Sequence, residues 1–527
     1  MHQGKALGGS SAVNAQVFAP PTKTIIDGWA ELGNEGWNWD ALRDYYSRVF
    51  TPPSVPEALR KQLGVDGLTA NNQTSNGPIH LSFPGDPSHP IREAWAETFR
   101  RKGYLMGEGP WAQASVGAFS NFASVDPDKR ERSYAGNAYY DLAKNRDNLH
   151  VLTEAHVEKI LFEEGHAAPR AIGVKYRHGG ESKTATALKE VIISAGALQS
   201  PKLLQLSGVG DRVLLDKFKI KVVKDLPAVG ENLLDHLICG VSYVVAEEAE
   251  TLDKLTRQEL EAFQEAVRLF AGKREDLLTS SGIKTYAYLP IVEYHTEGDR
   301  ETLEELMKES SPNAGDLRAR AYHDLADKML FRSNEPSGAY LTALSQSAVA
   351  VDSKTRKRRS PFAGKHFTIA TILSHPLSRG SVRIASDNPT QYPEIDPNYL
   401  SHPVDAEIFA QHMLYLDKIA CSAPFSDLLK EPVTLAFPPT PVLDVDAAKK
   451  HIKERAISMW HPAGTCAMLP ENMGGVVDTE LRVYGVKGLR VVDASVVPLL
   501  PAGNLQSTVY AVAERAADII KGAYGLK

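Results

Sequence analysis

The sequence predicts a mixed α/β (α+β) fold with at least two interlocked domains, and the chain length and two patterns indicate it. The chain has 527 residues, well above the roughly 250–300 at which a single hydrophobic core usually splits. Strand-like runs alternate with Gly- and charge-rich turns between His150 and Gly196. From about Glu247 to Phe331 the pattern changes to helical spacing. This second region is therefore interpreted as part of a second domain.

The sheet region contains three apolar runs, Val157–Phe162, Ala171–Tyr176 and Lys189–Ile193. Directly after them come Ser200, Pro201 and Gly208. A capping serine, a proline at the first helical position and a glycine just past the end are the signals of a short helix. We therefore expect a strand that runs into a helix beginning at Pro201.

The last predicted helix covers Gln506–Lys521. Its apolar residues recur at helical spacing, so one face is expected to pack inward. These residues are Val509, Val512, Ala513, Ala516, Ile519 and Ile520.

Composition and charge indicate a small-molecule partner. Lys and Arg number 59 against 65 Asp and Glu, giving a net charge of −6, so no nucleic-acid or acidic-membrane partner is predicted. Three distant cysteines without a CxxC pair predict neither a disulfide framework nor a metal site. No apolar run approaches the ~20 residues that span a bilayer, and the polar opening lacks a signal peptide's apolar stretch. We expect a soluble chain of unknown compartment.

Several sequence blocks occur in the order found in one enzyme family. The N-terminal block joins small and hydroxyl residues, where backbone can approach a ligand closely. The blocks are Gly4–Asn14 with Trp29–Asp40, Gly196–Gly210, Val229–His236, His375–Val382, Pro393–Leu400 and Ser458–Met468. Together they resemble the signatures of glucose-methanol-choline (GMC) oxidoreductases, and the resemblance covers essentially the whole chain.

The resemblance implies a fold, a cofactor and a reaction. It implies an FAD-binding domain built from residues 1–240 and 456–527, and a substrate-binding domain of antiparallel sheet and helices, mainly in 241–455. It also implies oxidation of a primary or secondary alcohol to a carbonyl by hydride transfer to FAD. Oxygen or another acceptor then reoxidises the cofactor.

Two residues match the catalytic pair of the family. Oxidation of an alcohol by hydride loss requires removal of the hydroxyl proton, and a neutral imidazole suits that step. His461 matches the family's catalytic histidine. Asn504 matches a position where family members carry His or Asn, and because an amide cannot act as a base, it is expected to hold the substrate oxygen.

The resemblance also identifies candidate cofactor-binding residues. Asn504 precedes the last helix, whose first N–H groups lack intrahelical partners and favour an anion; by resemblance this end lies near the pyrimidine edge of the flavin. Val157 matches a position whose backbone meets the adenine, and Asp493 one near the ribityl and pyrophosphate groups. The full set is Gly8, Gly9, Ser11, Asn14, Val157, Asp493, Ala494, Asn504, Leu505 and Gln506.

One expected part is missing from the chain as given. Family members open with a strand, a GxGxxG turn and a helix, which place the FAD pyrophosphate at a helix N-terminus. We therefore expect an N-terminally truncated FAD-binding domain. Either the natural protein is an ordinary FAD enzyme with a longer N-terminus, or the short chain is genuine. In the second case it is a cofactor-free scaffold or a non-redox, lyase-like enzyme. Retention of His461 and Asn504 favours the first.

Overall fold

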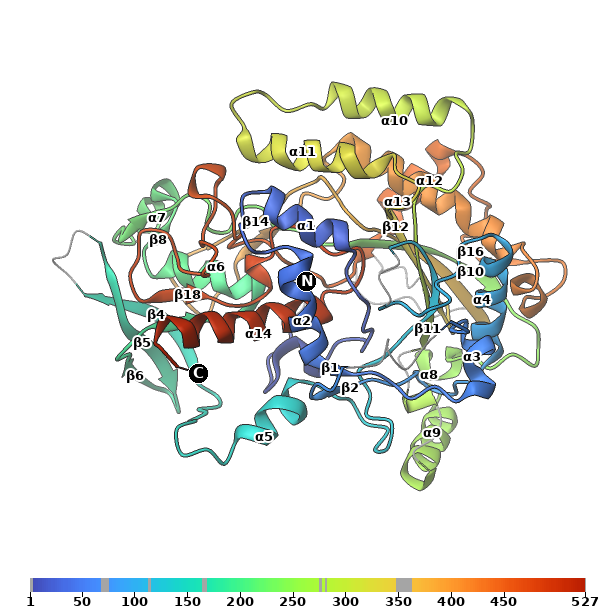
Figure 1. The fold of residues 1–527 in the computed structure, drawn as a ribbon, viewed down its shortest axis with the longest axis horizontal. Coiled ribbons are helices and arrows are strands. Elements are labelled where there is room, and N and C mark those ends of the chain that lie inside the picture. The colour runs from blue at the N-terminus through green and yellow to red at the C-terminus, as the bar shows by residue number, and fades with distance from the viewer. Residues whose placement is uncertain are drawn as a thin grey trace.

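The structure is a computed structural model that describes residues 3–67, 75–111, 115–163, 168–273, 277–279, 282–346 and 363–526. One large antiparallel sheet occupies one end of the molecule, and several small sheets and the long helix α14 (Gln506–Ala523) occupy the other (Figure 1). Helices α10 (Gly298–Glu309) and α11 (Leu317–Leu330) lie along one side. The mixed α/β class with an antiparallel sheet is confirmed; the domain boundaries at 240 and 455 stay predictions.

The large sheet has the strand order β16-β10-β13-β12-β11-β3, with β17 paired to β10. All its neighbouring strands are antiparallel. The bounds are β3 (Gly117–Ser120), β10 (Leu237–Val244), β11 (Ile283–Leu289), β12 (Gly338–Ala343), β13 (His366–Leu373), β16 (Leu435–Phe437) and β17 (Ile457–Ser458).

The two faces of this sheet pack against different elements. One face packs on the helices α4 (Pro90–Arg101) and α12 (Pro403–Ala420), with α13 (Val445–Arg455) packed on α12. The other face carries Phe119, Tyr286 and Tyr288, whose rings lie 5.5–5.6 Å apart between centroids. This aromatic cluster also packs against Ala502. Since Ala502 is two residues before Asn504, the aromatic face adjoins the candidate site.

Among its described residues, the region predicted to be helical contains several helices and the strand β11. Besides α10 and α11, it forms α8 (Asp253–Thr256) and α9 (Leu260–Lys273). Within it, β11 is a strand of the large sheet, so the helical prediction is wrong there. β11 is rich in β-formers and almost wholly buried, and sheet pairing on both sides overrides the surrounding helical pattern.

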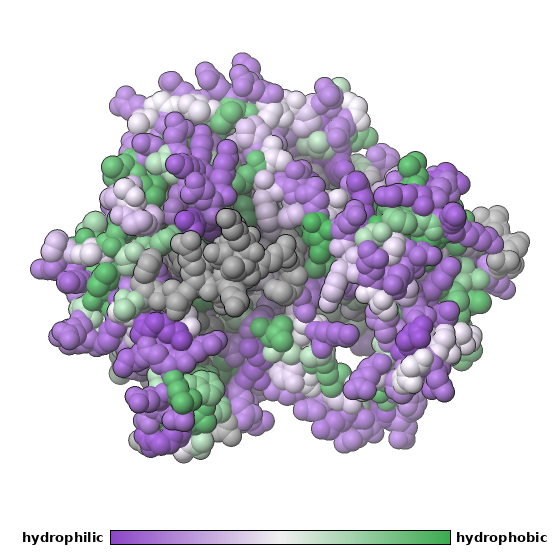
Figure 2. Space-filling model, turned by 180° about the vertical axis from the view of Figure 1, so that it is seen from behind, coloured by the Kyte–Doolittle hydropathy of each residue, from purple (hydrophilic) through white to green (hydrophobic). Residues whose placement is uncertain are grey.

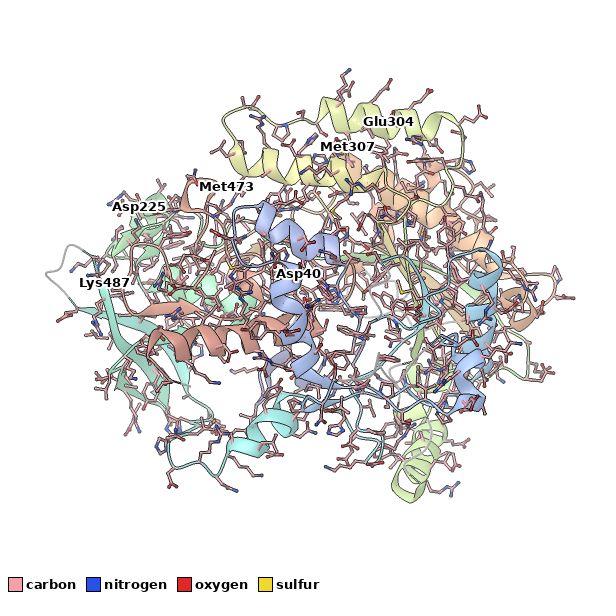
Figure 3. All side chains as sticks on the ribbon, viewed as in Figure 1. Asp40, Asp225, Glu304, Met307, Met473 and Lys487 are labelled. Atoms are coloured by element: carbon pink, nitrogen blue, oxygen red, sulfur yellow. The ribbon has the colours of Figure 1, made fainter. Side chains whose placement is uncertain are left out.

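The surface helices α9 and α10 differ in how they place their apolar residues. On α10, Glu304 points to solvent while Met307, 2% exposed, faces inward (Figure 3). On α9, by contrast, Leu260, Phe263 and Val267 are all exposed. An amphipathic pattern therefore identifies a helix in both cases but gives the buried face only for α10.

The small sheets include every strand predicted before residue 196. The antiparallel sheet is β4 (His156–Glu163), β5 (Arg170–His178) and β6 (Glu181–Thr186). β7 (Val191–Ile193) and β18 (Leu489–Val491) form a parallel pair, as do β1 (Phe50–Thr51) with β2 (Ile79–His80) and β8 (Val209–Gly210) with β9 (Lys224–Asp225). β14 (Ser381–Arg383) pairs with β15 (Glu394–Asp396).

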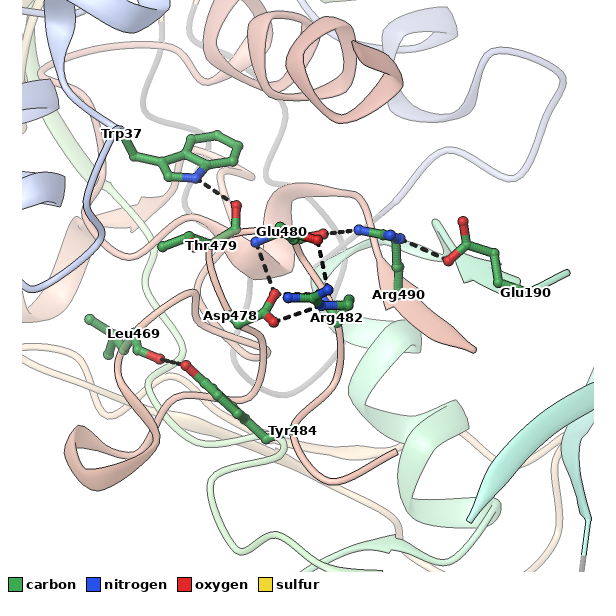
Figure 4. Close-up of polar contacts among 9 residues, drawn as sticks. All are labelled: Trp37, Glu190, Leu469, Asp478, Thr479, Glu480, Arg482, Tyr484 and Arg490. Carbon is green, nitrogen blue, oxygen red and sulfur yellow. Dashed lines mark hydrogen bonds and ion pairs between the residues drawn. The ribbon is translucent and has the colours of Figure 1, made fainter. Parts of the chain in front are cut away.

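A buried ion pair links the β7 and β18 segments, which are about 300 residues apart in the chain. Arg490 of β18 donates from Nε to Glu190, just before β7, at 2.7 Å, and both side chains are less than 8% exposed. Arg490 also donates to the Glu480 carbonyl, in the turn that Asp478 and Arg482 hold together (Figure 4). Removing one partner of a buried pair leaves an uncompensated charge, so this contact fixes where β18 lies.

Helix α6 (Gly196–Leu206) starts earlier than predicted. Pro201 therefore stands inside the helix, where its missing N–H leaves the carbonyl of residue 197 without a donor. The Thr465 hydroxyl supplies that donor, at 2.6 Å from the Ala197 oxygen. Ser200 accepts from the Ala195 N–H and donates to Asp493 instead of capping the helix. The prediction of a helix beginning at Pro201 was wrong because a distant hydroxyl supplies the missing hydrogen bond.

Helix α14 starts at the predicted residue and ends two residues later than predicted. Val512 and Ala516 are buried as expected, but Ala513 is exposed and lines the cavity described below. Tyr46 donates to Thr508 of α14 at 3.0 Å. The remaining helices are α1 (Lys23–Glu31), α2 (Trp39–Val49), α3 (Glu57–Leu63), α5 (Asp141–Ala143) and α7 (Arg212–Lys217).

The surface in Figure 2 is mostly hydrophilic, with hydrophobic residues scattered among polar ones where the structure describes the chain. Among the described residues, none of the helices combines the length and the apolar character needed to cross a membrane.

Candidate active site

A cavity of about 450 Å³ lies where the N-terminal loop meets the starts of α6 and α14. Many of its lining residues are Gly, Ser or Ala. It is lined by the predicted residues Gly8, Gly9, Ser11, Asn14, His461, Asp493, Ala494, Asn504, Leu505 and Gln506. Segments from both ends of the sequence therefore form one site.

Val157 lies in a neighbouring cavity of about 500 Å³. The two cavities share Gln3, Gly4 and Ala195 in their walls. The two cavities are therefore neighbours, and His461 lines one while Val157 lines the other.

His461 is held at both its main chain and its side chain by two consecutive residues. Its backbone N–H donates to Asp235 Oδ1 at 2.8 Å. Its Nδ1 lies 2.9 Å from Nδ1 of His236, and His236 Nε2 lies 2.9 Å from the Ser374 carbonyl oxygen. Asp235 also accepts from the hydroxyls of Ser458, at 2.5 Å, and Tyr399. The imidazole therefore has a fixed orientation.

The hydrogen bonds also fix the tautomer of His461. A carbonyl only accepts, so Nε2 of His236 carries hydrogen and donates to Ser374. Burial lowers the pKa of His236 to about 4, so its Nδ1 is unprotonated and accepts from His461 Nδ1–H. Burial and the neighbouring His236 also lower the pKa of His461 well below its usual range. His461 is therefore neutral, with an unprotonated Nε2.

Asn504 faces that unprotonated nitrogen. Its Nδ2 donates to His461 Nε2 at 3.1 Å, while its Oδ1 accepts from the Tyr286 hydroxyl at 3.1 Å. The two bonds give the Asn504 amide one orientation. The loop before it runs close to the large sheet, because a Cβ on Gly503 would lie 2.4 Å from the Tyr288 oxygen. A side chain at 503 would push Asn504 away from His461.

Trp460 directly precedes His461 and has a positive φ of 56°. That region is unfavourable for a bulky residue. Its N–H donates to the Ser458 hydroxyl at 2.8 Å, and its ring is 46% exposed and lines the cavity. The left-handed turn therefore brings the next residue to Asp235 and leaves an aromatic ring at the cavity edge.

The N-terminal loop forms a tight backbone cradle. Gly8 has φ 90°, and a Cβ there would lie 2.7 Å from the Tyr134 ring and 2.9 Å from the Gly136 nitrogen. Only glycine fits both conditions. Ser11 donates to the Gly8 carbonyl at 2.6 Å and accepts from the Ala135 N–H at 3.2 Å, so it locks the loop.

Asn14 and Gln506 join the two ends of the chain. Asn14 Nδ2 donates to Gln506 Oε1 at 2.9 Å, and Arg132 donates to Asn14 Oδ1 at 2.7 Å. Gln506 opens α14, whose N-cap residue Leu505 makes no side-chain capping bond. The first turn of α14 holds no acidic residue. Its free N–H groups therefore attract electron-rich atoms in the cavity.

Asp493 connects two elements in the cavity wall. Its Oδ2 accepts from the Gly196 N–H at 2.8 Å and the Ser200 hydroxyl at 2.5 Å, both in α6. Its Oδ1 accepts from the N–H and hydroxyl of Ser495, at 2.8 and 2.5 Å. All four bonds end on the carboxylate, so this side chain shapes the cavity instead of reaching into it.

Family models for GMC oxidoreductases match residues 1–238 and 376–513. Together these ranges cover well over half of the chain. The chain belongs to the GMC oxidoreductase family. The matches leave the expected N-terminal truncation untested, so it stays a prediction.

Individual GMC relatives agree with this assignment. A GMC oxidoreductase family protein, Mala s 12 of Malassezia sympodialis, is 33% identical over 99% of this chain and 80% of its own length. Dehydrogenase citC of Monascus ruber is 33% identical, with 98% and 83% covered. Among solved structures, an FAD-dependent oxidoreductase from Chaetomium thermophilum is 28% identical, with a TM-score of 0.85 over 100% of this chain and 87% of that one. A fungal aryl-alcohol oxidase is 27% identical, with a TM-score of 0.81 over 99% and 86%.

FAD is the cofactor of this GMC oxidoreductase, and the residues present fit it. The glycine cradle around Gly8 admits backbone contact, and the start of α14 offers free N–H groups. The two neighbouring cavities are lined by His461 and by Val157, respectively. The carboxylate of Asp493, the acidic residue that lines the first cavity, is directed at donors of α6 and Ser495.

Sequence reasoning missed three residues of this GMC site: His236, Tyr286 and Trp460. His236 is the last residue of the block Val229–His236, which resembles a family signature. The Asp-His pair at the end of that block could therefore have indicated a role for His236 in the site. Tyr286 carries no such signal, because the pairing of β11 in the large sheet brings it to Asn504. Trp460 lies inside the quoted Ser458–Met468 block, but its left-handed backbone is visible only in the structure.

Proposed function

We propose that this FAD-dependent oxidoreductase oxidises a primary or secondary alcohol to the corresponding carbonyl compound. The observation that supports this most strongly is the fixed, neutral tautomer of His461, whose Nε2 faces Asn504 beside the cofactor cavity. A neutral imidazole beside a substrate hydroxyl accepts its proton as the C–H bond breaks. When bound, FAD supplies the acceptor for the hydride that leaves the alcohol carbon.

The protein's residues divide this work among them. Asn504 orients the substrate oxygen through its Nδ2, and His461 Nε2 takes the hydroxyl proton. The resulting imidazolium keeps its Nδ1–H bond to His236, which becomes stronger because the donor is now charged. Gly8 and the first turn of α14 hold the cofactor, and oxygen or another acceptor receives the electrons.

The test is reduction of the bound flavin without oxygen. The purified protein is incubated with FAD, freed of excess cofactor and mixed anaerobically with a panel of primary and secondary alcohols. At least one alcohol is expected to bleach the flavin absorbance. His461→Ala is expected to keep its FAD and to slow that reduction by about 10²–10⁴-fold, the usual contribution of a positioned base. Hydrogen peroxide formed in air identifies oxygen as the acceptor.

The matched control is His80→Ala, which removes an exposed histidine on β2. It is expected to reduce its flavin at the wild-type rate. Unchanged reduction in His461→Ala would remove His461 from the proposed role. An alcohol that is converted without bleaching the flavin would contradict oxidation and favour the lyase-like alternative.

A further inference from the structure

An exposed aromatic residue, Tyr392, lines the cavity of about 500 Å³ that also contains Val157. Its side chain is 84% exposed, more than any other aromatic side chain among the described residues. The same cavity is lined by Leu198, Leu203 and Leu206 of α6. An uncovered aromatic ring and apolar residues therefore border one space, which suits a flat aromatic group.

The segment that carries Tyr392 is held in place by contacts with two other elements. The Pro389 carbonyl accepts from Lys202 Nζ of α6 at 2.7 Å and from His156 Nε2 of β4 at 3.2 Å. Pro393 follows Tyr392 and restricts its backbone to extended conformations, and β15 begins at the next residue. The ring is therefore carried by a fixed backbone, so it lies at the cavity before any ligand binds.

FAD has two ring systems, and the two neighbouring cavities offer a place for each. His461 lines the first cavity, and the proton acceptor must lie beside the flavin ring. The second cavity shares Gln3, Gly4 and Ala195 with the first, and its volume lies within the roughly 300–1,000 Å³ of small-molecule sites. Because flavin and adenine form opposite ends of FAD, adenine is the flat group expected in the second cavity.

We propose that Tyr392 binds the adenine of FAD by stacking its ring on the base. Stacking depends on the face of the ring and not on the polar edge of the base. The hydroxyl of Tyr392 is not required, so a phenylalanine serves equally well. The proposal rests on FAD as the cofactor and does not depend on alcohol oxidation.

The test compares FAD with FMN, which has the same flavin ring but no adenine. The full chain is freed of cofactor and titrated with each compound by calorimetry. Tyr392→Ala is expected to weaken FAD binding about 5- to 150-fold, the usual effect of removing one base–aromatic stack, and to leave FMN binding unchanged. Tyr392→Phe is expected to keep the wild-type affinity for FAD. Unchanged FAD binding in Tyr392→Ala, or equal weakening of FAD and FMN, would overturn the proposal.

ADP tests the adenine end directly, because it carries the base without the flavin. ADP is expected to bind the cofactor-free wild-type protein and to lose affinity in Tyr392→Ala by about the same factor as FAD. An equal affinity of ADP for the two proteins would overturn the stacking.

The matched control is Phe263→Ala, which removes another exposed ring, 53% exposed on α9 and outside both cavities. It is expected to bind FAD as the wild-type protein does. The thermal midpoint of cofactor-free Tyr392→Ala is also expected to match that of the wild type, since a change at an exposed side chain has little effect on stability. The same loss of FAD affinity in Phe263→Ala would show a general effect of removing surface rings and would overturn the proposal.

Discussion

The Nδ1 atoms of His461 and His236 lie 2.9 Å apart, at the centre of a chain of hydrogen bonds that begins at Tyr286 and ends at the Ser374 carbonyl. The Ser374 end sets the polarity of this chain, because a carbonyl can only accept. The chain therefore determines which nitrogen of His461 is free. Neighbouring residues share the task, since Asp235 holds the backbone of His461 while His236 holds its ring.

His236 is expected to act by positioning His461. His236→Ala removes the acceptor for His461 Nδ1–H, so the base loses its fixed tautomer and its support when charged. A hydrogen bond to a charged group contributes about 1.5–3 kcal/mol, so flavin reduction is expected to slow about 10- to 100-fold. FAD content is expected to stay near the wild-type value. The measurement is anaerobic stopped-flow reduction by an alcohol over a range of pH.

A conservative variant separates positioning from general damage to the fold. In His236→Asn, the side-chain oxygen can accept from His461 Nδ1–H, so reduction is expected to recover much of the lost rate. Equal rates for the Ala and Asn variants would contradict a tautomer-fixing role.

Tyr286 is expected to hold the amide of Asn504 in the productive orientation. Tyr286→Phe removes the donor to Asn504 Oδ1, so the amide can rotate and turn its oxygen toward His461 Nε2. The expected loss is about 2- to 10-fold in kcat/KM, the range of one net hydrogen bond. Steady-state kinetics with the best alcohol measure it.

Tyr288→Phe is the matched control for Tyr286→Phe. Tyr288 lies on the same strand and in the same aromatic cluster, but its hydroxyl donates to the Pro20 carbonyl at 2.9 Å. Tyr288→Phe is expected to lower the free energy of unfolding without the loss in kcat/KM that is expected for Tyr286→Phe. A larger kinetic defect in Tyr288→Phe than in Tyr286→Phe would sink the assignment.

The sequence predicts the candidate site well where one local segment carries the signal. His461 and Asn504 each lie in a recognisable block, and the structure brings them together across 43 residues of chain. The strands before residue 196 follow from runs of apolar residues. The start of α14 follows from periodicity alone. These features depend on short-range patterns.

Features that depend on distant partners could not be predicted in this way. The start of α6 was wrong because Thr465 compensates for Pro201 from outside the helix. Ala513 was expected to pack inward, but it faces the cofactor cavity. Tyr286 reaches Asn504 only through the register of the large sheet. In each case the deciding contact joins segments that no local pattern connects.

Asp493 is expected to be needed for retention of FAD. In Asp493→Asn, one oxygen is replaced by an NH₂ group that faces donors from Gly196 and Ser200 or from Ser495. Such a pair of facing donors lowers the free energy of unfolding by about 1.5–3 kcal/mol. The repulsion also displaces the cavity walls formed by α6 and Ala494. The FAD-to-protein ratio after gel filtration is expected to fall.

Asp478→Asn is the control, because Asp478 also accepts several bonds but lies in the turn shown in Figure 4, outside both cavities. Equal FAD loss in both variants would mean that the effect is general.

Buried neutral histidines are expected to make the protein sensitive to mild acid. Burial lowers the pKa of His236 to about 4 and those of His375 and His412 to about 3, whereas an unfolded histidine titrates near pH 6.5. Between these values the unfolded chain binds protons that the folded chain does not. Stability is therefore fully present above about pH 6.5 and decreases as the pH falls toward 4.

For each such histidine, the free energy of unfolding decreases by about 1.4 kcal/mol per pH unit as the pH falls through this window. The midpoint of thermal unfolding is expected to fall steadily between about pH 6.5 and pH 5, above the range where carboxylates dominate. His412→Asn is expected to reduce this slope, because it removes one of the groups, although the buried bonds to Ser337 and Tyr340 change and lower the midpoint at neutral pH. A midpoint that is flat across this window would show that these histidines are protonated in the folded protein, and would also remove the basis for a neutral His461.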